Sequence, residues 1–436
     1  MKRLLACFAA ILAVSAAATA QPKVSEKQEI AIFSLGYYGW NIPLEVLGDI
    51  DLEVQKVFSD LGRFTISGVA QRLSSGGLEQ FIAALKAAKQ ANFVLPEKYQ
   101  FNEAVLTEAD FNKLLGAFIV AAPVVTRFNS YYDSKRIEWI TEMTTKVTFV
   151  DVEAGGGVLA IAEVESSGSH KDNQTKSISS AIDGIPNQLQ YEIRKIPAFQ
   201  ISTRVLSVSG SEAKLQLGQD MGLKKGDEYS VVARSVVEGF EDTRETGLIV
   251  IKDVGSQVST GRIVYNAGKL AKDAQLQEIP RLGVDAEPYL HVLMGEELGA
   301  VPGVRAVVTR GFYGFRPYGA VQIPLAEISS FFTVSFIPVS GIVGGELNLP
   351  LGRLELSPFA GVGATYVHLN EAVSGTSTKT EYLAHVGLQA YARLSFLITR
   401  DMRIFAEAGL DYWQTVSDYF DSYGGLGFGA GAAFKL

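Results

Sequence analysis

Apolar and polar positions alternate strictly along the last third of the chain. Between residues 382 and 396 every even-numbered residue is apolar, and the odd-numbered positions carry most of the polar side chains. The same alternation runs through residues 353–367 and 403–413. A period of two residues predicts β-strands that have one apolar face. Each run is longer than ten residues, which matches a tilted strand that crosses a bilayer.

We predict eight such strands. Backbone groups in lipid must all be hydrogen-bonded, so the sheet must close into a barrel. Short connections near 313–314, 350–352 and 399–401 alternate with longer ones, including 370–379 and 417–422, as is typical of outer-membrane barrels. The predicted strands lie near residues 286–295, 303–312, 315–324, 331–349, 353–368, 380–397, 402–415 and 423–436.

The last predicted strand is unusually rich in glycine. Residues 427–432 match the letters of the dinucleotide-binding fingerprint G-x-G-x-x-A, but only four residues follow them, and a phosphate loop needs a helix after it. Instead, glycines alternate with an apolar set that includes Leu426 and Phe428. We therefore predict a strand whose apolar face meets lipid. Its glycines face a lumen crowded by the side chains of other strands.

Charged and polar residues of the fifth, sixth and seventh predicted strands share the inward face. An eight-stranded barrel is just wide enough inside for side chains to fill it. We interpret these residues as a plug of paired charges, because unpaired charges would be costly there; a proton or ion path is the alternative. The predicted lumen cluster is Arg353, Glu355, His385, Gln389, Arg393, Arg403, Glu407 and Asp411.

The first residues have the pattern of a secretory signal. Lys2 and Arg3 precede an apolar stretch that ends at Ala17, and small residues follow up to Ala20. We predict cleavage between Ala20 and Gln21, so that residues 1–20 are removed. The mature chain would then contain no cysteine, hence no disulfide and no thiol chemistry.

Two further domains are expected between the signal and the barrel. Residues 21–198 mix both periodicities and predict an α+β domain, whereas residues 199–282 predict a small all-β barrel. In the first we expect strands at 30–35 and 64–67, helices at 47–61, 78–90 and 176–194, and a hairpin over 145–152 and 158–164. In the second we expect strands at 201–208, 213–217, 228–236, 246–254 and 256–265.

Several short segments carry resemblances to known families. Leu61-Gly62-Arg63-Phe64 and the hairpin after Phe149 resemble periplasmic domains of the curli-secretion lipoprotein, the TolB N-terminal domain and flagellar T-ring proteins. The turn at 222–228, GLKKGDE, is similar to that of the small SH3-like barrel in T-ring proteins; we expect its lysines to be solvated, without a binding role. Residues 283–436 resemble OmpA-type outer-membrane barrels, although such chains commonly end in an aromatic residue and this one ends in Leu436.

These resemblances imply an outer-membrane protein with its N-terminal domains in the periplasm. The net charge of −8, which becomes two units more negative without the signal, argues against a nucleic-acid partner. The four histidines lack zinc-site spacing, and no Walker loop or G-x-S-x-G elbow is present. We therefore expect no metal, cofactor or catalytic residues.

The leading functional hypothesis is a non-enzymatic binding or scaffold protein. The barrel would sit in outer-membrane lipid, and the two preceding domains would bind a periplasmic protein or a peptidoglycan-associated partner. The alternative is a small-solute channel or surface adhesin that acts through the lumen or the outer loops. An envelope hydrolase is a third possibility, without a recognisable catalytic constellation to support it.

Overall fold

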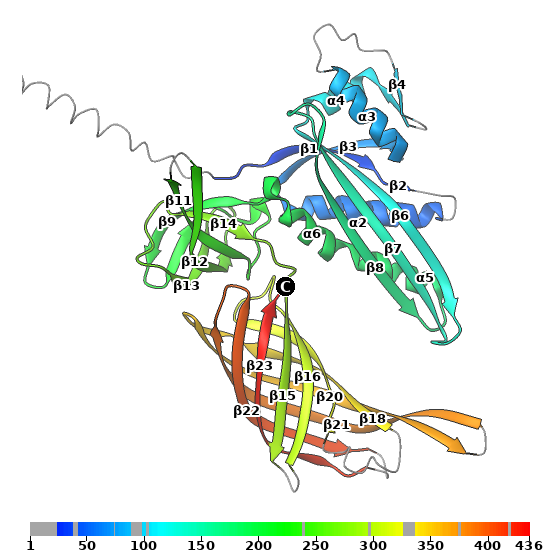
Figure 1. Ribbon diagram of the computed structural model, residues 1–436, viewed down its shortest axis with the longest axis vertical. Coiled ribbons are helices and arrows are strands. Elements are labelled where there is room, and N and C mark those ends of the chain that lie inside the picture. Colours follow the sequence, from blue (N-terminus) through cyan, green and yellow to red (C-terminus); the bar gives the residue numbers. More distant parts are fainter. Residues whose placement is uncertain are drawn as a thin grey trace, which may run out of the picture.

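The computed structural model describes residues 24–436 apart from gaps at 38–41, 74, 89–97, 102–103, 238–239, 295–297, 326–335, 374–375 and 417–419. Three units follow one another along the chain: a mixed α/β domain, a small six-stranded barrel and a large eight-stranded barrel (Figure 1). This confirms the predicted fold class. The predicted signal segment and its cleavage site at Ala20 and Gln21 lie outside the described residues.

The α/β domain is built on one twisted sheet with the strand order β3-β1-β6-β7-β8, and β2 also pairs with β6. Strand β1 is parallel to β3 and β6, whereas β6, β7 and β8 form an antiparallel meander. The strands are β1 (Gln28–Ser34), β2 (Gly36–Tyr37), β3 (Phe64–Arg72), β6 (Ile119–Asp133), β7 (Glu138–Asp151) and β8 (Gly157–His170). A separate small hairpin pairs β4 (Lys98–Phe101) with β5 (Ala104–Thr107).

Helices cover both faces of this sheet, because β1 is apolar on both sides. Ile30 and Ile32 pack with the first helix group, and Ala31 and Phe33 pack with the second. The first group is α2 (Leu44–Leu61), α5 (Gln174–Asp183) and α6 (Ile185–Lys195); the second is α3 (Ser75–Ala88) and α4 (Glu108–Gly116).

The prediction of one helix over 176–194 was wrong. The helix divides into α5 and α6 at Gly184, and a proline lies in the first turn of α6. Proline has no backbone N–H and cannot continue the preceding helix, but it fits the first turn of a new one. The 3₁₀ turn η1 (Pro197–Phe199) then leads into the small barrel.

The small barrel closes in the order β10-β13-β12-β11-β14-β9. Its sixth strand, β14, was not predicted, because five residues with the sequence QLQEI offer only two apolar side chains. The 3₁₀ turn η2 (Gln219–Met221) lies between β10 and β11. The strands are β9 (Ser202–Ser209), β10 (Glu212–Leu215), β11 (Glu228–Val237), β12 (Phe240–Val254), β13 (Ser259–Asn266) and β14 (Gln275–Ile279).

The large barrel is an antiparallel meander that closes where the first strand, β15, pairs with the last, β23. All eight predicted strands are present, but the second begins five residues earlier than predicted. They are β15 (Val284–Met294), β16 (Leu298–Val308), β17 (Phe315–Gln322), β18 (Phe336–Leu347), β20 (Leu354–Val373), β21 (Thr376–Leu397), β22 (Met402–Thr415) and β23 (Tyr423–Lys435). The short β19 (Leu349–Leu351) adds to the end of β20.

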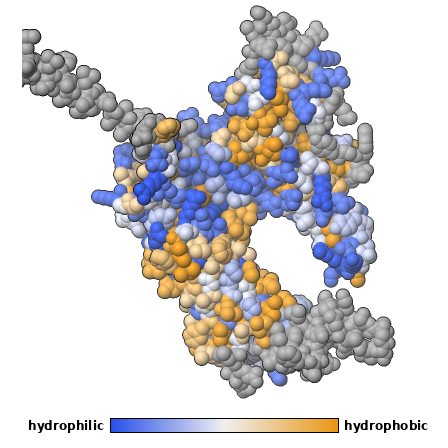
Figure 2. Space-filling view, viewed as in Figure 1, coloured by the Kyte–Doolittle hydropathy of each residue, from blue (hydrophilic) through white to orange (hydrophobic). Residues whose placement is uncertain are grey.

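The two faces of the large barrel differ as the alternation predicts. Leu388, Leu410 and Phe428 point outward and are about half exposed, whereas Gln389 and Glu407 point inward and are buried. Hydrophobic residues gather on the outer surface of this barrel, in contrast to the more hydrophilic domains above it (Figure 2). Among the described helices, none is long and apolar enough to cross a membrane.

Gly427, Gly429 and Gly431 of β23 lie where atoms of other strands leave no room for a Cβ, which yields a prediction. A Cβ at Gly429 would collide with the imidazole of His291 and lie 3.1 Å from Cγ of Glu407. Gly429→Leu should therefore destabilise the large barrel by about 1–3 kcal/mol through overpacking, measured as the urea midpoint of the folded-to-unfolded gel-mobility shift. Phe428→Leu, on the outer face, should change the midpoint little. The reverse ranking would mean that the two faces are exchanged.

Candidate functional site

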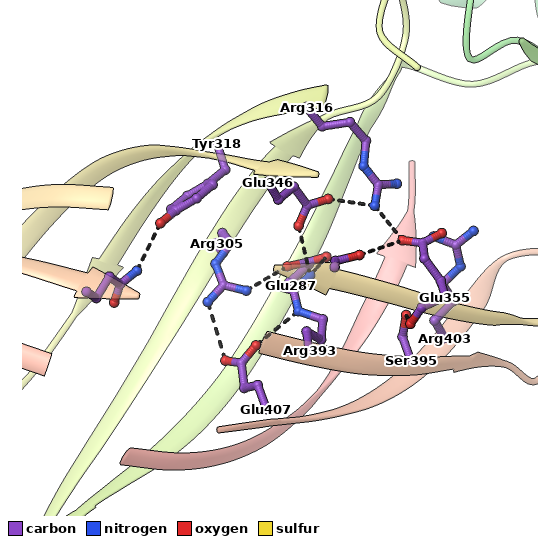
Figure 3. Close-up of polar contacts among 12 residues, drawn as sticks. Glu287, Arg305, Arg316, Tyr318, Glu346, Glu355, Arg393, Ser395, Arg403 and Glu407 are labelled. Carbon is purple, nitrogen blue, oxygen red and sulfur yellow. Dashed lines mark hydrogen bonds and ion pairs between the residues drawn. The ribbon is translucent and has the colours of Figure 1, made fainter. Parts of the chain in front are cut away.

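A network of buried ion pairs crosses the interior of the large barrel (Figure 3). It consists of four carboxylates and four guanidinium groups, and seven of the eight strands contribute to it. Strand β23 contributes none of these charged groups, and its inward glycines leave room for the side chains of other strands. The members of this lumen network are Glu287, Arg305, Arg316, Glu346, Glu355, Arg393, Arg403 and Glu407.

Arg393 is the centre of the lumen network. Its Nη1 lies 3.0 Å from Oε1 of Glu287 and 3.3 Å from Oε2 of Glu346, and its Nε lies 3.0 Å from Oε2 of Glu407. These carboxylates come from β15, β18 and β22, so one guanidinium group on β21 ties together distant parts of the barrel wall.

The remaining pairs extend the lumen network toward both ends. Arg305 lies 3.2 Å from Glu287 and 3.4 Å from Glu407. Arg316 binds Glu346 at 2.6 Å and also binds Glu355. Arg403 then binds Glu355 at 2.9 Å. Within the lumen network the numbers of opposite charges are equal, which favours their burial.

Aromatic rings complete the filling of the lumen. The guanidinium carbon of Arg305 lies 4.2 Å from the ring centre of Phe359 and 4.9 Å from that of Tyr289. Arg393 lies 4.7 Å from the ring centre of Phe405. These cation–π contacts add attraction in a desolvated interior. They also occupy the space that a solute would need.

The structure places seven of the eight predicted lumen residues inside the barrel. Glu355, Arg393, Arg403 and Glu407 belong to the lumen network. The other three lie nearer the far end: Gln389 donates to the hydroxyl of Tyr318, Asp411 accepts from Tyr391 and Trp413, and Nε2 of His385 lies 2.9 Å from the backbone oxygen of Asp421.

The predicted lumen position of Arg353 was wrong. Arg353 lies in the turn before β20, where it donates to the backbone oxygens of Leu397 and Ile398. Its guanidinium carbon lies 4.1 Å from the ring centre of Tyr265 in the small barrel. The alternation stops at the strand end, so the parity of residue 353 no longer indicates an inward side chain.

Sequence reasoning missed the half of the lumen network that comes from the first four strands. Glu287, Arg305, Arg316 and Glu346 lie on strands with proline, glycine or aromatic interruptions, where the two-residue pattern is weaker. A signal was nevertheless present in β15, since its odd positions include Asp285, Glu287, Tyr289 and His291.

A second ionic cluster joins the three units of the chain. Glu278, on β14, binds Arg63 at 2.9 Å and Arg194, on α6, at 2.6 Å. Arg194 also lies 3.3 Å from Asp227, and Asp227 binds Arg310 from the β16–β17 turn at 2.8 Å. We call these five residues the junction cluster. It connects the α/β domain, the small barrel and the large barrel.

Burial and charge together explain the state of Glu278. Burial by itself would raise the pKa of this carboxyl group, but the neighbouring Arg63 and Arg194 overcome that effect and lower its pKa to about 2. Glu278 also accepts a hydrogen bond from the backbone N–H of Ile201 at 3.0 Å. The carboxylate therefore stays charged and fully bonded at neutral pH.

Two turns singled out in the sequence meet at this junction. A Cβ at Gly62 would lie 2.9 Å from Cα of Gly222, and both glycines have positive φ angles of 66° and 73°. Only glycine allows this backbone conformation together with so close an approach. The backbone oxygen of Lys225 accepts from the N–H of Gly311 in the large barrel at 2.7 Å. The turn is thus a contact between units. The side chain of Lys225 is exposed as expected, whereas that of Lys224 is partly buried.

A groove of about 780 Å³ lies between the α/β domain and the small barrel. Phe118 and Leu159 contribute apolar surface to it, and Arg63, Glu153 and Arg234 contribute charge. Phe118 is 49% exposed, which is unusual for a large aromatic side chain. The volume lies in the range of ordinary ligand-binding clefts. No group of three or more potential metal ligands occurs among the described residues.

Comparisons with known proteins add the following findings. No protein-family model and no curated protein matches the chain. Solved structures match at low identity, and each of the three named here covers 35% of this chain. Neisserial surface protein A is 12% identical, with 96% of its own chain covered and a TM-score of 0.27. The N-terminal β-barrel domain of Pseudomonas aeruginosa OprF is 12% identical, with 96% of its chain covered and a TM-score of 0.23, and Yersinia pestis Ail is 13% identical, with 95% covered and a TM-score of 0.22.

The strand topology itself defines the class of this part of the chain. Residues 284–435 form an eight-stranded antiparallel barrel with an apolar outer face and a charged, side-chain-filled interior. This is the arrangement of small outer-membrane barrels. The C-terminal unit therefore resembles OmpA-like outer-membrane proteins.

The lumen network predicts a large effect of removing its central cation. Arg393→Met leaves three buried carboxylates short of one partner, so the barrel should lose about 3–5 kcal/mol of stability. The measurement is urea unfolding of the full chain folded into lipid vesicles. Leu394→Met is the matched control, because Leu394 lies on the outer face and is 53% exposed. Equal midpoints for both variants would contradict a stabilising role for the lumen network.

The junction cluster predicts a pH-dependent stability. A carboxyl pKa lowered from 4.5 to about 2 contributes stability that is present above pH 4.5 and is lost as the pH falls toward 2. The protection factor for hydrogen exchange of the backbone around Ile201, which is the intrinsic rate divided by the observed rate, should therefore fall over that range in the full chain. Glu278→Gln should show low protection already at neutral pH, because removing one partner of a buried ion pair costs about 3–5 kcal/mol.

The control for this measurement is an exposed ion pair in the α/β domain. Glu163 lies 3.3 Å from Lys146, and its side chain is 51% exposed. Glu163→Gln should leave exchange around Ile201 unchanged, because surface pairs contribute little. If Glu278→Gln behaves like Glu163→Gln, the junction cluster does not hold the units together.

Proposed function

We propose that this protein is a non-enzymatic binding or scaffold protein anchored in the outer membrane, with the α/β domain and the small barrel in the periplasm. The observation that carries the proposal is the filled lumen. Buried ion pairs cross it and aromatic rings pack between them, so the large barrel serves as an anchor. Function then falls to the two units outside it.

The filled lumen disfavours the channel hypothesis on energetic grounds. A solute path would require Arg393 to leave Glu287, Glu346 and Glu407, all of which are at least nine-tenths buried. Separating a buried pair without replacement partners leaves uncompensated charge, which costs several kcal/mol. Eight strands also leave little free area even before side chains are considered.

The groove between the α/β domain and the small barrel is the best candidate for the partner site. It combines an exposed aromatic side chain, Phe118, with charged residues on both walls. Such a combination suits an extended peptide or a polar polymer, because apolar anchors supply affinity and charged groups supply orientation. A periplasmic protein segment or a peptidoglycan-associated partner fits this description.

One observation favours surface adhesion as a second candidate function. Strands β20 and β21 contain 20 and 22 residues and remain paired up to Val373 and Thr376. A tilted strand needs only about 9–11 residues to cross a bilayer. The hairpin extends well past the other strands, at the end of the barrel away from the two other units (Figure 1). It would project from the cell surface.

Photo-crosslinking in intact cells tests the leading proposal. A photoreactive amino acid at position 118 of the full chain should capture a specific envelope component, whereas the same group at Leu52, which is 65% exposed on α2, should not. Fractionation should place the protein in the outer membrane, with its N-terminal domains resistant to protease added outside. Capture at neither position, together with unitary conductance steps of the purified protein in bilayers, would favour the channel instead.

A further inference from the structure

The end of the β6–β7 hairpin carries exposed aromatic and apolar side chains. Tyr131 and Tyr132 are 37% and 49% exposed, and Ile137 in the turn is 65% exposed. The ring centres of Tyr132 and Trp139 lie 5.6 Å apart across the hairpin. We call residues 131–139 the arm tip. None of these four side chains belongs to the hydrophobic core of the α/β domain.

The turn holds Ile137 in an exposed position by local hydrogen bonds. The backbone N–H of Ile137 donates to the backbone oxygen of Asp133 at 2.8 Å, and the Asp133 carboxylate accepts from the N–H of Lys135 at 2.8 Å. Ile137 has a φ of 58°. A β-branched residue rarely adopts this left-handed conformation, and such outliers cluster at functional positions.

The arm tip reaches back toward the large barrel. In Figure 1 the β6–β7–β8 meander runs from the centre of the α/β domain down the right side, and its end lies lower than the C-terminus, which marks the start of the barrel. In Figure 2 the hydrophobic surface of the barrel begins above that level. The junction cluster fixes this orientation, because it ties α6 to both barrels.

We propose that the arm tip inserts into the headgroup region of the leaflet that surrounds the near end of the large barrel. This inference rests on the proposed membrane position of that barrel. Tyr and Trp side chains favour membrane–water interfaces, because an apolar ring carries a polar group that stays hydrated. Ile137 adds apolar surface, and the alkyl parts of Lys135 and Arg136 can lie along the interface while their charges remain in water.

The charges of the arm tip indicate which lipid chemistry is needed. Lys135 and Arg136 are balanced by Asp133 and Glu138, and Nε of Arg136 lies 3.9 Å from Asp133. A balanced tip gains little from negatively charged lipid. The contact should therefore form on zwitterionic phospholipid through its aromatic and apolar side chains. A second contact of this kind would hold the α/β domain at a fixed height above the membrane.

Lipid quenching of a single fluorophore tests the inference on the full mature chain. Removal of the signal leaves no cysteine, so Ile137→Cys provides one site for a polarity-sensitive label. The labelled protein is folded into zwitterionic bilayers that contain brominated phosphatidylcholine. Two further variants calibrate the result: Leu388→Cys on the outer face of the large barrel, and Glu108→Cys on α4, at the end of the α/β domain farthest from the barrel (Figure 1).

We expect the label at position 137 to be quenched at least threefold more than the label at 108, and to the same extent when anionic lipid is added. If the label at 388 is quenched but the label at 137 is quenched no more than the label at 108, the arm-tip contact is overturned while the anchor stays supported. Quenching at 137 that requires anionic lipid would also overturn it. Absence of quenching at 388 would instead refute the membrane position of the barrel, and with it the premise of this inference.

Discussion

Burying a carboxylate is costly unless a cation or hydrogen-bond donors compensate its charge, and this constraint shapes both the interior and the assembly of this protein. In the large barrel, four carboxylates and four guanidinium groups neutralise one another across the lumen. At the junction, Glu278 and Asp227 are matched by arginines from two other units. Breaking either set leaves a buried charge unpaired, which is far more costly than the loss of a surface pair.

The two clusters serve different purposes. The lumen network fills the barrel and makes it a rigid plug, which is consistent with an anchor and not with a pore. The junction cluster uses the same chemistry between units, so that the α/β domain, the small barrel and the large barrel are held in one orientation. Close backbone contact between Gly62 and Gly222 adds a shape requirement to the electrostatic one. A groove and a projecting arm tip keep their positions relative to the large barrel as a result.

The proposed role follows from this rigidity. A flexible tether would suffice if the barrel were only an anchor for a mobile binding domain, and it would not require a charged cluster buried between three units. Fixing the orientation makes sense if the binding groove must stand at a defined height and direction relative to the membrane. The proposed membrane contact of the arm tip, through its exposed tyrosines and Ile137, would serve the same end.

The sequence alone determined the fold class and most of the large barrel, because a two-residue alternation sustained over more than ten residues is typical of strands in a membrane barrel. Phe428 outward and Gly429 inward could be read directly from that pattern. The lumen pairing could be only half predicted. Arg393 and Glu407 were found by parity, but the partners Glu287 and Glu346 of Arg393, and the partner Arg305 of Glu407, lie on strands whose alternation is interrupted.

Only the tertiary structure decided which charges meet. Arg63 and Glu278 are 215 residues apart, and no local pattern links them. Arg353 was misplaced because parity loses its meaning beyond a strand end, where contact with Tyr265 governs the side chain. Periodicity reports which face of one element is buried; the choice of partners depends on how separate elements pack, and that information is distributed over the whole chain.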